Sequence, residues 1–258
     1  MDVLLCGRGF IGSRIEELLD ESVYTLDRGE ADYQLDVTEE FSIEKKFDVV
    51  IHTIGLAPGL YSPSDYREVH VEGTKNIING VNAEKVIYIS ALGIGRVDHS
   101  YFHTKKEAEE LVKDSGMDYT ILRPSVVAGE GNYLLDMVEK FSFTRMFPKM
   151  KAEIQPVTLD DLTRVVEASL REFGGETLDI AGPERILISE YARQVYGENG
   201  KRCFLVPFPR LPLEKLPGKN LLPGFLNPEN LALLDMDNTT GENDAERILE
   251  PETPEMFQ

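Results

Sequence analysis

The pattern of hydrophobic and polar residues in the first half of the chain alternates between short apolar runs and amphipathic segments. Residues 3–5 form a continuous apolar run, which is typical of a strand buried on both faces of a parallel sheet. After it, Ile11, Ile15, Leu18 and Leu19 recur at helical spacing. Further strands are predicted at residues 22–27, 35–37, 48–55, 85–90 and 117–124, and further helices at 64–81 and 101–115. This order predicts an α/β fold, a Rossmann-type doubly wound parallel sheet.

The pattern changes beyond Gly129, where the elements become shorter. An extended segment is predicted at 154–157, helices at 158–173 and 189–196, and strands at 176–180 and 203–206. We therefore predict a first domain over residues 1–150 and a small C-terminal α+β cap over 151–258, with some later segments able to return to the first domain. The stretch 207–228 is rich in Pro and Gly and is predicted to wind over the surface. The stretch from Gly241 onward holds six acidic residues and one Arg and is predicted to fray.

A glycine turn follows the first predicted strand. Gly7, Gly9 and Gly12 have the spacing G-x-G-x-x-G, and the helical pattern comes directly after them. In a dinucleotide-binding unit, Gly7 permits a tight turn, Gly9 lets the backbone approach a pyrophosphate, and Gly12 lets the helix pack against its strand. The helix N-terminus then faces the phosphates. A glycine turn in an unrelated strand–helix unit is the alternative, and the order of strand, turn and helix argues against it.

A carboxylate closes the second predicted strand, twenty residues after Gly7. A dinucleotide-binding fold places at this distance the acid that hydrogen-bonds the adenosine ribose hydroxyls, so Asp27 favours NAD over NADP. Arg28 leaves NADP open, since a guanidinium could accept its 2′-phosphate. A role for Asp27 as a turn residue before Gly29 is the alternative.

Composition and charge narrow the range of partners. The 258 residues carry a net charge of −19, which argues against nucleic acid, because phosphate backbones are bound by Lys and Arg. No stretch approaches the ~20 apolar residues of a membrane span, and the chain starts directly in its first strand, so neither a transmembrane segment nor a signal peptide is expected. The two cysteines, Cys6 and Cys203, form no disulfide framework, and Cys6 is expected to be buried and inert. These features predict a cytoplasmic protein, and no metal site is expected.

Tyr101 and Lys105 are candidates for acid–base chemistry. They lie four residues apart at the start of a predicted helix, so both point from the same face. A tyrosine with a pKa near ~10 is a poor catalyst at neutral pH, but a lysine cation one turn away lowers that pKa. Such a pair moves a proton to or from a carbonyl or alcohol while hydride moves to or from a nicotinamide. His52, in the fourth of these strands, is interpreted as a hydrogen-bonded core or edge histidine rather than a catalyst.

Six segments carry a resemblance to a known family. They are GRGFIG at 7–12, DVVIHTIG at 48–55, VHVEGTKNII at 69–78, YISALG at 88–93, YFHTKKEAE at 101–109 and TILRPSVVAG at 120–129. Together they resemble the short-chain dehydrogenase/reductase superfamily, in its NAD-dependent epimerase/dehydratase group of extended and atypical members. Three later segments, IQPVTLDDL at 154–162, LDIAGPE at 178–184 and LALLDMDN at 231–238, are similar to the branch that contains the nucleotide-binding accessory subunit of respiratory complex I.

The resemblance implies roles for individual residues. Those implied to hold the cofactor are Gly7, Arg8, Gly9, Phe10, Ile11, Gly12, Asp27, Arg28, Asp36, Val37, Thr53, Ile54, Gly55, Lys105, Pro124, Ser125 and Val126. Those implied to be catalytic are Tyr101, Lys105 and Ser90. For the third of these, alignment on the strand favours Ala91, which has no hydroxyl, whereas alignment on the downstream glycine favours Ser90.

Two functions from different classes follow from the sequence. The first is an NAD(H)-dependent oxidoreductase or epimerase/dehydratase that acts on a carbonyl or alcohol, nucleotide sugars included, through Tyr101 and Lys105. The second is a non-catalytic NAD(P)H-binding structural or sensor protein that resembles the complex I accessory subunit. The Tyr–Lys pair favours the first function, whereas the open question at Ser90 and the short region after Pro207 favour the second. The negative charge disfavours RNA binding as a third function. The sequence does not specify the small-molecule substrate. A homodimer is possible.

Overall fold

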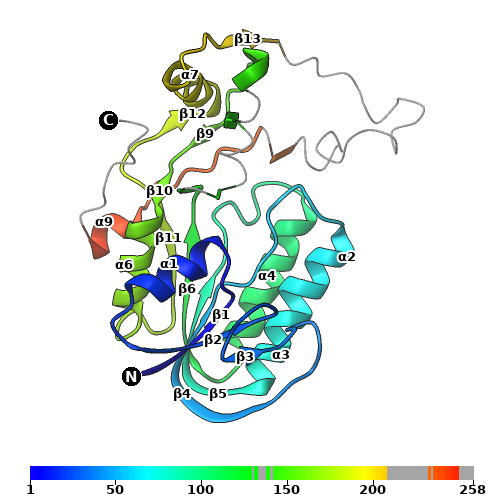
Figure 1. The fold of residues 1–258 in the computed structure, drawn as a ribbon, viewed down its shortest axis with the longest axis vertical. Helices are drawn as coiled ribbons and strands as arrows, with labels where there is room; N and C mark the ends of the chain where they lie inside the picture. Colours follow the sequence, from blue (N-terminus) through cyan, green and yellow to red (C-terminus); the bar gives the residue numbers. More distant parts are fainter. Residues whose placement is uncertain (130, 133–137, 140–141, 208–231, 234, 250–258) are drawn as a thin grey trace.

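A seven-stranded parallel sheet forms the centre of the molecule (Figure 1). The structure is a computed structural model that describes residues 1–129, 131–132, 138–139, 142–207, 232–233 and 235–249. The sheet has the order β11-β6-β5-β4-β1-β2-β3. Its strands are β1 (Asp2–Cys6), β2 (Ser22–Asp27), β3 (Tyr33–Gln34), β4 (Ile43–His52), β5 (Val81–Ile89), β6 (Asp118–Pro124) and β11 (Glu176–Ile180). The predicted Rossmann-type doubly wound sheet is confirmed.

Helices cover both faces of this sheet (Figure 1). One face carries α1 (Phe10–Leu18), α6 (Leu159–Ser169) and α9 (Asp244–Ile248). The other carries α2 (Pro63–Tyr66), η1 (Arg67–Glu72), α3 (Gly73–Gly80) and α4 (Ser100–Lys113). The helix predicted over 64–81 is therefore present as three consecutive pieces, with the π-helical turn η1 between two α-helical pieces.

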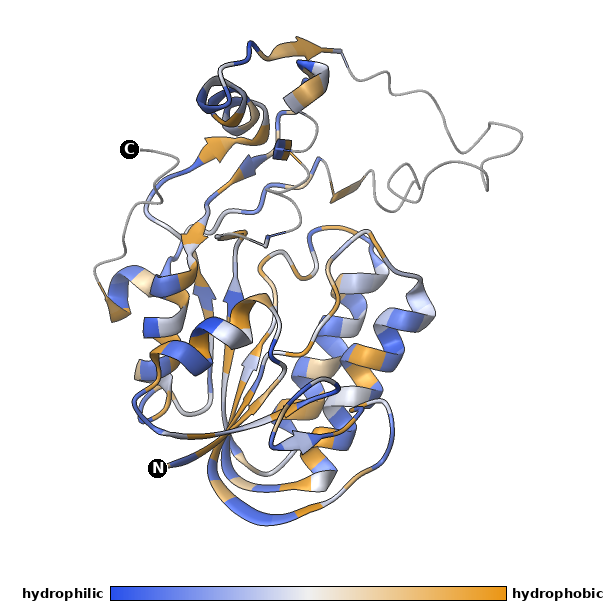
Figure 2. Ribbon diagram, viewed as in Figure 1, coloured by the Kyte–Doolittle hydropathy of each residue, from blue (hydrophilic) through white to orange (hydrophobic). Residues whose placement is uncertain are grey.

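Side chains of the strands alternate between the two faces, which buries the sheet on both sides. In β1, Val3 and Leu5 pack with Ile15 of α1, whereas Leu4 and Cys6 pack in the cluster on the opposite face. Figure 2 shows the corresponding hydrophobic colour along the central strands. Cys6 is fully buried as predicted, and burial raises the pKa of its thiol well above the usual value, so the thiol stays protonated.

A smaller lobe lies beyond the carboxyl ends of the strands (Figure 1). It contains η2 (Ser142–Thr144), β8 (Met146–Pro148), β9 (Glu153–Ile154), β12 (Ile186–Leu187), α7 (Ile188–Glu198) and β13 (Phe204–Val206). The pair β7 (Val127–Ala128) and β10 (Val157–Thr158) lies between this lobe and the sheet. The small lobe has a hydrophobic core of its own, which includes Phe147, Tyr191 and Tyr196. Of the region 151–258, α6, β11 and α9 return to the sheet, so the later part of the chain contributes to both halves of the molecule.

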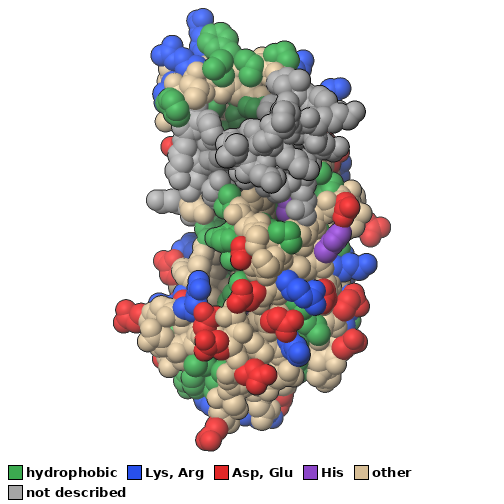
Figure 3. All heavy atoms as spheres, turned by 90° about the vertical axis from the view of Figure 1, so that its right-hand side faces the viewer, with side chains coloured by type: hydrophobic (Ala, Val, Ile, Leu, Met, Phe, Trp, Pro, Cys, Tyr) green, Lys and Arg blue, Asp and Glu red, His purple; other side chains and the backbone are tan. Residues whose placement is uncertain are grey.

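The surface of the sheet-containing part is rich in charge. Figure 3 shows acidic side chains spread over this part of one face, with lysines and arginines among them. The small lobe instead exposes several large apolar side chains, Phe143, Met146 and Phe204. Among the described residues no helix has the length and apolar character needed to cross a membrane.

The third strand differs from the sequence prediction. It lies at Tyr33–Gln34 rather than at 35–37. The carboxylate of Asp32 accepts hydrogen bonds from the amide and hydroxyl of Thr25, which holds this part of the chain beside β2. The carboxylate of Asp36 accepts from the amide and hydroxyl of Thr38, at 3.0 and 2.8 Å, which turns the chain directly after the strand. The predicted surface path of 207–228 lies outside the described residues beyond Pro207.

The predicted fraying from Gly241 is wrong for the residues up to 249. Asn243 caps α9 by accepting from the Ala245 amide, and it also hydrogen-bonds both the amide and the carbonyl of Ala181, at 3.0 and 2.9 Å. Ala245 is fully buried against the sheet. The acidic composition predicts a solvated tail. The side-chain amide of Asn243 instead bonds to the backbone of Ala181 as a neighbouring strand would, and so holds α9 against the sheet. Residues 250–258 lie outside the described part.

We expect Asn243→Ala to lower the free energy of unfolding by about 1–3 kcal/mol, because it removes the helix cap and leaves the Ala181 backbone groups without this partner. Urea denaturation monitored by circular dichroism measures the change. Asn82→Ala, at an exposed position of β5, is the matched control and should stay within ~0.5 kcal/mol of the wild type. Equal stability of the two variants would show that α9 docks without Asn243.

Candidate active site

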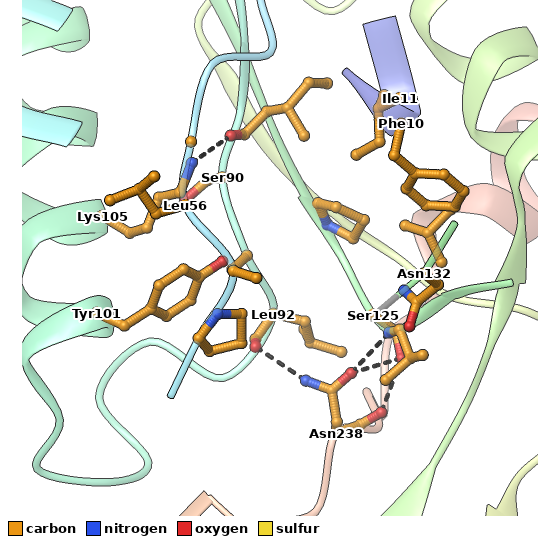
Figure 4. A pocket seen from close by; sticks show the side chains of 18 of the residues that line it. Phe10, Ile11, Leu56, Ser90, Leu92, Tyr101, Lys105, Ser125, Asn132 and Asn238 are labelled. Carbon is orange, nitrogen blue, oxygen red and sulfur yellow. Dashed lines mark hydrogen bonds between the residues drawn. The ribbon is translucent and has the colours of Figure 1, made fainter. Parts of the chain in front are cut away.

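A cavity of about 470 Å³ lies at the carboxyl ends of the central strands, where parallel sheets place their ligands. The predicted site residues that line it are Gly9, Phe10, Ile11, Gly12, Thr53, Gly55, Ser90, Tyr101, Lys105, Pro124, Ser125 and Val126. The predicted residues outside its lining are Gly7, Arg8, Asp27, Arg28, Asp36, Val37 and Ile54. Figure 4 shows Tyr101 and Lys105 on one side of the cavity and Phe10 and Ile11 on the opposite side. The fold thus brings the glycine turn and the Tyr–Lys pair to one space.

The glycine turn has no room for side chains at two of its three glycines. Gly7 has a φ of +98°, and a Cβ there would lie 2.8 Å from side-chain atoms of both Thr53 and Ile54. A Cβ at Gly12 would lie 1.8 Å from the carbonyl oxygen of Gly7, so α1 packs directly on the turn. The hydroxyl of Thr53 donates to the carbonyls of Cys6 and Gly7, both at 3.0 Å, and fixes the path of the turn.

Gly9 differs from the other two glycines, because a Cβ there would meet nothing within 4 Å. It is the N-cap of α1, and the first turn of this helix holds no acidic side chain. The first amides of a helix have no acceptor within it, and the helix dipole places partial positive charge at this end. Open space at the positive end of a helix, next to the cavity, fits the pyrophosphate of a dinucleotide.

Asp27 lies at the end of β2, beside the glycine turn. One carboxylate oxygen accepts from the Arg8 amide at 2.8 Å, and the other accepts from the Gly29 amide at 2.9 Å. Burial alone would raise the pKa of Asp27, but these backbone hydrogen bonds hold it below the usual value. The group is therefore an ionised acceptor, which fits the hydroxyls of a ribose.

The remaining residues at this end have other partners within the protein. The guanidinium of Arg8 pairs with Glu16 at 2.7 Å and donates to the carbonyl of Glu30, so it faces α1 and the chain after β2. Arg28 is largely exposed, and its guanidinium lies 3.8 Å from the carboxylate of Asp36. At this position Arg28 could contact the 2′-phosphate of NADP, so Arg28 and Asp36 do not distinguish NAD from NADP at the adenosine ribose. Val37 is buried, and its carbonyl accepts from an asparagine side chain of α3.

Lys105 is buried beneath the cavity. Its ammonium donates to the Ile89 carbonyl at 2.9 Å and lies 4.8 Å from the centre of the Tyr88 ring. Burial lowers its pKa to about 7, against the opposing field of the Glu109 carboxylate. A Cβ at Gly55 would lie 3.0 Å from the ammonium nitrogen, so a residue without a side chain at this position lets the lysine reach the cavity.

Tyr101 projects from the same face of α4 toward the cavity (Figure 4). Its ring packs edge-on against the rings of Tyr66, His70 and Phe102, with centroids 5.6, 5.4 and 5.1 Å apart. The sequence predicts that Lys105 lowers the pKa of this phenol, but in the structure burial raises it well above the usual value. The reason is that the ammonium of Lys105 is directed to a carbonyl and another ring. Tyr101 is therefore a protonated acid at rest.

The loop after β4, at residues 55–61, forms one wall of the cavity and is held by two buried rings. Nε2 of His70 accepts from the Leu56 amide at 3.0 Å, while Nδ1 lies 2.9 Å from the hydroxyl of Thr104. Burial lowers the pKa of His70 far below its usual value, so the ring stays neutral and keeps this acceptor. The hydroxyl of Tyr66 donates to the Ala57 carbonyl at 2.9 Å. These contacts position the loop, and the sequence pattern gave no sign of them.

Ser90 lines the cavity, but its hydroxyl is hydrogen-bonded to a side chain of α4. It donates to the carboxylate of Glu109 at 2.6 Å, and Glu109 forms a bidentate ion pair with Arg123 at 2.8 and 2.6 Å. Ala91, the alternative at this position, packs in the cluster that contains Tyr101. The Ser90–Glu109–Arg123 network joins β5, α4 and β6, the elements that carry the site.

Asn238 ends the segment 231–238, and the sequence predicts no role for it. Its side-chain oxygen accepts from the Ser125 hydroxyl at 2.7 Å and the Val126 amide at 2.9 Å, and its side-chain nitrogen donates to the Leu92 carbonyl at 3.0 Å (Figure 4). One side chain near the C-terminal end therefore joins the loops after β5 and β6 at the edge of the cavity. Asn238 stands in a polar run, Asp237–Thr240, and nothing in that run connects it to distant loops.

The interpretation of His52 as a core residue is confirmed. It is buried, its Nε2 lies 2.9 Å from the Thr74 hydroxyl, and burial lowers its pKa to about 3. In the described ranges no cluster of three or more His, Cys, Asp or Glu side chains could hold a metal ion.

Comparison with known proteins agrees with this geometry. A family model described as NAD(P)H-binding matches residues 12–144, about half of the chain. The chain is also 25% identical over 194 residues to the 40 kDa subunit of mitochondrial NADH-ubiquinone oxidoreductase from Neurospora crassa. That match covers 72% of this chain and 52% of the relative, so the chain spans about half of the relative's length.

Solved structures with the same fold include sugar-nucleotide epimerases. UDP-glucose 4-epimerase of Thermotoga maritima superposes with a TM-score of 0.69 and 17% identity, over 81% of this chain and 86% of the epimerase. UDP-glucuronic acid 4-epimerase of Bacillus cereus, in a complex that contains NAD, superposes with a TM-score of 0.68 and 18% identity, over the same shares of the two chains. At these identities the likeness establishes the fold.

Proposed function

The chain belongs to the NAD(P)H-binding family, and from this premise we propose that it is an NAD(H)-dependent oxidoreductase of the short-chain type. The observation that carries the proposal is the placement of Tyr101 and Lys105 on one face of α4, in the lining of the cavity that the glycine turn also lines. Figure 4 shows Phe10 and Ile11, at the start of α1, across the cavity from this pair, so the cavity could take a dinucleotide held at Gly9 with its nicotinamide end toward Tyr101.

The residues divide the work of binding and proton transfer. The N-terminus of α1 holds the pyrophosphate, and Asp27 accepts hydrogen bonds from the adenosine ribose. The bound nicotinamide supplies a hydride to a carbonyl carbon, or accepts one from an alcohol. Tyr101, which is protonated at rest, gives its phenolic proton to the carbonyl oxygen. The Lys105 ammonium, one turn along α4, would hold the nicotinamide ribose.

Nucleotide binding without turnover is the second candidate function. It is supported by the hydroxyl of Ser90, which is already bonded to Glu109 and so does not stand free beside Tyr101. The similarity to a respiratory complex subunit points in the same direction. In that case the Tyr101–Lys105 pair holds the nicotinamide ribose, and the protein serves a structural or sensing role.

We expect NADH to bind more tightly than NADPH, because the ionised Asp27 repels a 2′-phosphate. We further expect Gly9→Val to weaken the binding of NADH by roughly 10- to 100-fold in a protein that folds normally. The branched side chain would fill the open space beside the turn, where the pyrophosphate is proposed to bind. Calorimetric titration of both cofactors into both proteins measures these affinities. Equal or tighter binding of NADPH would show that Arg28, and not Asp27, determines the cofactor preference. Unchanged NADH affinity in Gly9→Val would show that the pyrophosphate does not bind at Gly9.

The oxidoreductase itself is tested by adding carbonyl compounds to the protein with NADH and following the nicotinamide absorbance. Loss of this absorbance in step with alcohol formation supports the proposal. Tight NADH binding with no turnover of any carbonyl compound would favour the second candidate.

A further inference from the structure

Most of the cavity lining is apolar, and six of its large side chains form what we call the apolar wall. Leu56 and Leu60 come from the loop after β4, Leu92 from the loop after β5, and Phe102 from α4. Ile154 of β9 and Met236 of the segment before Asn238 complete this wall. These side chains come from five separate places in the chain, so the apolar character belongs to the assembled cavity and not to a single run of sequence.

The polar side chains at the edge of this region are already bonded to the protein. The amide of Asn238 bonds to the loops after β5 and β6 through both its oxygen and its nitrogen. The Ser125 hydroxyl donates to the side chain of Asn238 at 2.7 Å. The phenol of Tyr101 faces the cavity among apolar side chains, and Asn132 lines the cavity on the side of Phe10 (Figure 4). Such a wall recognises a carbonyl oxygen at one point and hydrocarbon elsewhere.

The charge of the lining argues against an anionic substrate. Among the described residues that line the cavity, Lys105 is the sole charged side chain, and its ammonium donates to the Ile89 carbonyl. Arg96 follows Leu92 in the same loop, but it donates to the carbonyls of Asp237 and Thr239 and does not line the cavity. A nucleoside diphosphate needs cations or an array of amides in its binding site, because buried charge without a partner is strongly unfavourable.

We propose that the substrate is an uncharged, apolar ketone, or its secondary alcohol in the reverse direction, and not a nucleotide sugar. This inference rests on the proposed oxidoreductase function. The carbonyl carbon gains the hydride that NADH supplies, and the carbonyl oxygen gains the proton of Tyr101. The C=O π bond breaks, one C–H and one O–H bond form, the ketone is reduced to an alcohol, and NADH is oxidised to NAD⁺. Solvent returns the proton to Tyr101.

The test uses the full-length protein with saturating NADH and a series of methyl ketones, namely 2-butanone, 2-hexanone and 2-octanone. The charged counterpart is 7-oxooctanoate, which places a carboxylate at the far end of the same chain. UDP-4-keto-6-deoxyglucose is included as a nucleotide sugar that carries a ketone. We expect kcat/KM to rise roughly 2- to 4-fold for each added methylene, because each is removed from water. We expect 7-oxooctanoate to be at least roughly 10-fold poorer than 2-octanone. No chain-length dependence, or a preference for 7-oxooctanoate or UDP-4-keto-6-deoxyglucose, would overturn the inference.

A matched pair of variants tests whether this wall makes the choice. Met236→Lys places a cation in the apolar wall and should raise the ratio of kcat/KM for 7-oxooctanoate over 2-octanone by roughly 10-fold or more. Met236→Leu keeps the wall apolar and should leave that ratio within about 2-fold of the wild type. NADH affinity, measured on both variants, shows that each one folds. An unchanged ratio in Met236→Lys would place the substrate elsewhere.

Binding to the NADH-loaded protein separates this inference from the proposed function. Calorimetry with 2-octanone and 7-oxooctanoate reports their affinities whether or not turnover occurs. Tighter binding of 2-octanone without turnover keeps the apolar substrate class and refutes the oxidoreductase. Turnover of UDP-4-keto-6-deoxyglucose or 7-oxooctanoate in preference to 2-octanone keeps the oxidoreductase and refutes the apolar class. Failure of 2-octanone to bind or turn over refutes the apolar class as well.

Discussion

Tyr101→Phe should reduce ketone turnover by roughly 10²- to 10⁴-fold while NADH affinity changes by less than about 3-fold, because the change removes the proton donor and keeps the ring. The ring of Tyr101 packs against three aromatic neighbours, and phenylalanine preserves those contacts, so the fold and the cavity should persist. Steady-state kinetics with 2-octanone and calorimetry with NADH measure the two quantities separately.

Tyr61→Phe is the matched control for this substitution. Tyr61 lies on the loop beside the cavity and is exposed, so loss of its hydroxyl should leave turnover within about 2-fold of the wild type. Near-normal turnover in Tyr101→Phe would remove the phenol from the mechanism. A similar loss in Tyr61→Phe would show that the assay responds to the loop rather than to proton transfer.

Ser90→Ala decides whether a third residue joins the pair. The hydroxyl of Ser90 donates to Glu109, which is already paired with Arg123, and not to a group in the cavity. We therefore expect a loss in turnover of less than about 5-fold. A loss as large as that of Tyr101→Phe would instead restore a triad of Ser90, Tyr101 and Lys105.

The central sheet could be predicted from the sequence because its signals are local. A buried parallel strand appears as a short apolar run, and its glycine turn has no acceptable substitute at Gly7 or Gly12. The positions of Tyr101 and Lys105 followed from helical spacing and from their place after a strand. Each of these inferences needs only the neighbouring residues.

The parts that escaped prediction depend on contacts between distant segments. Asn238 meets Ser125 and Val126 across more than 100 residues of sequence, and nothing near any of them indicates the pairing. Asn243 docks α9 by bonding to Ala181, although the composition around it is that of a solvated tail. The pKa of Tyr101 also depends on its surroundings, since the lysine one turn away turns toward a carbonyl while aromatic rings enclose the phenol.

Lys105→Met should raise the free energy of unfolding by roughly 2–4 kcal/mol at pH 7 while weakening NADH binding by about 10-fold or more. Burial lowers the pKa of Lys105 from its ordinary 10.5 to about 7 in the folded protein, so the unfolded chain binds this proton more tightly. The stability penalty is therefore complete below pH 7 and shrinks as the pH rises toward 10.5. Methionine fills similar space without charge, although it forfeits the hydrogen bond to the Ile89 carbonyl.

Urea denaturation of both proteins at about pH 6 and about pH 9 measures this effect, and the gain should be larger at the lower pH, because wild-type Lys105 is then fully charged. Lys106→Met, at the exposed neighbouring position, is the control and should change stability by less than ~0.5 kcal/mol at either pH. A variant no more stable than wild type at about pH 6 would mean that the Ile89 carbonyl and the field of Glu109 fully offset the burial of the ammonium. A gain in stability with a loss in NADH affinity would show that the buried ammonium of Lys105 lowers the stability of the fold and contributes to binding of NADH.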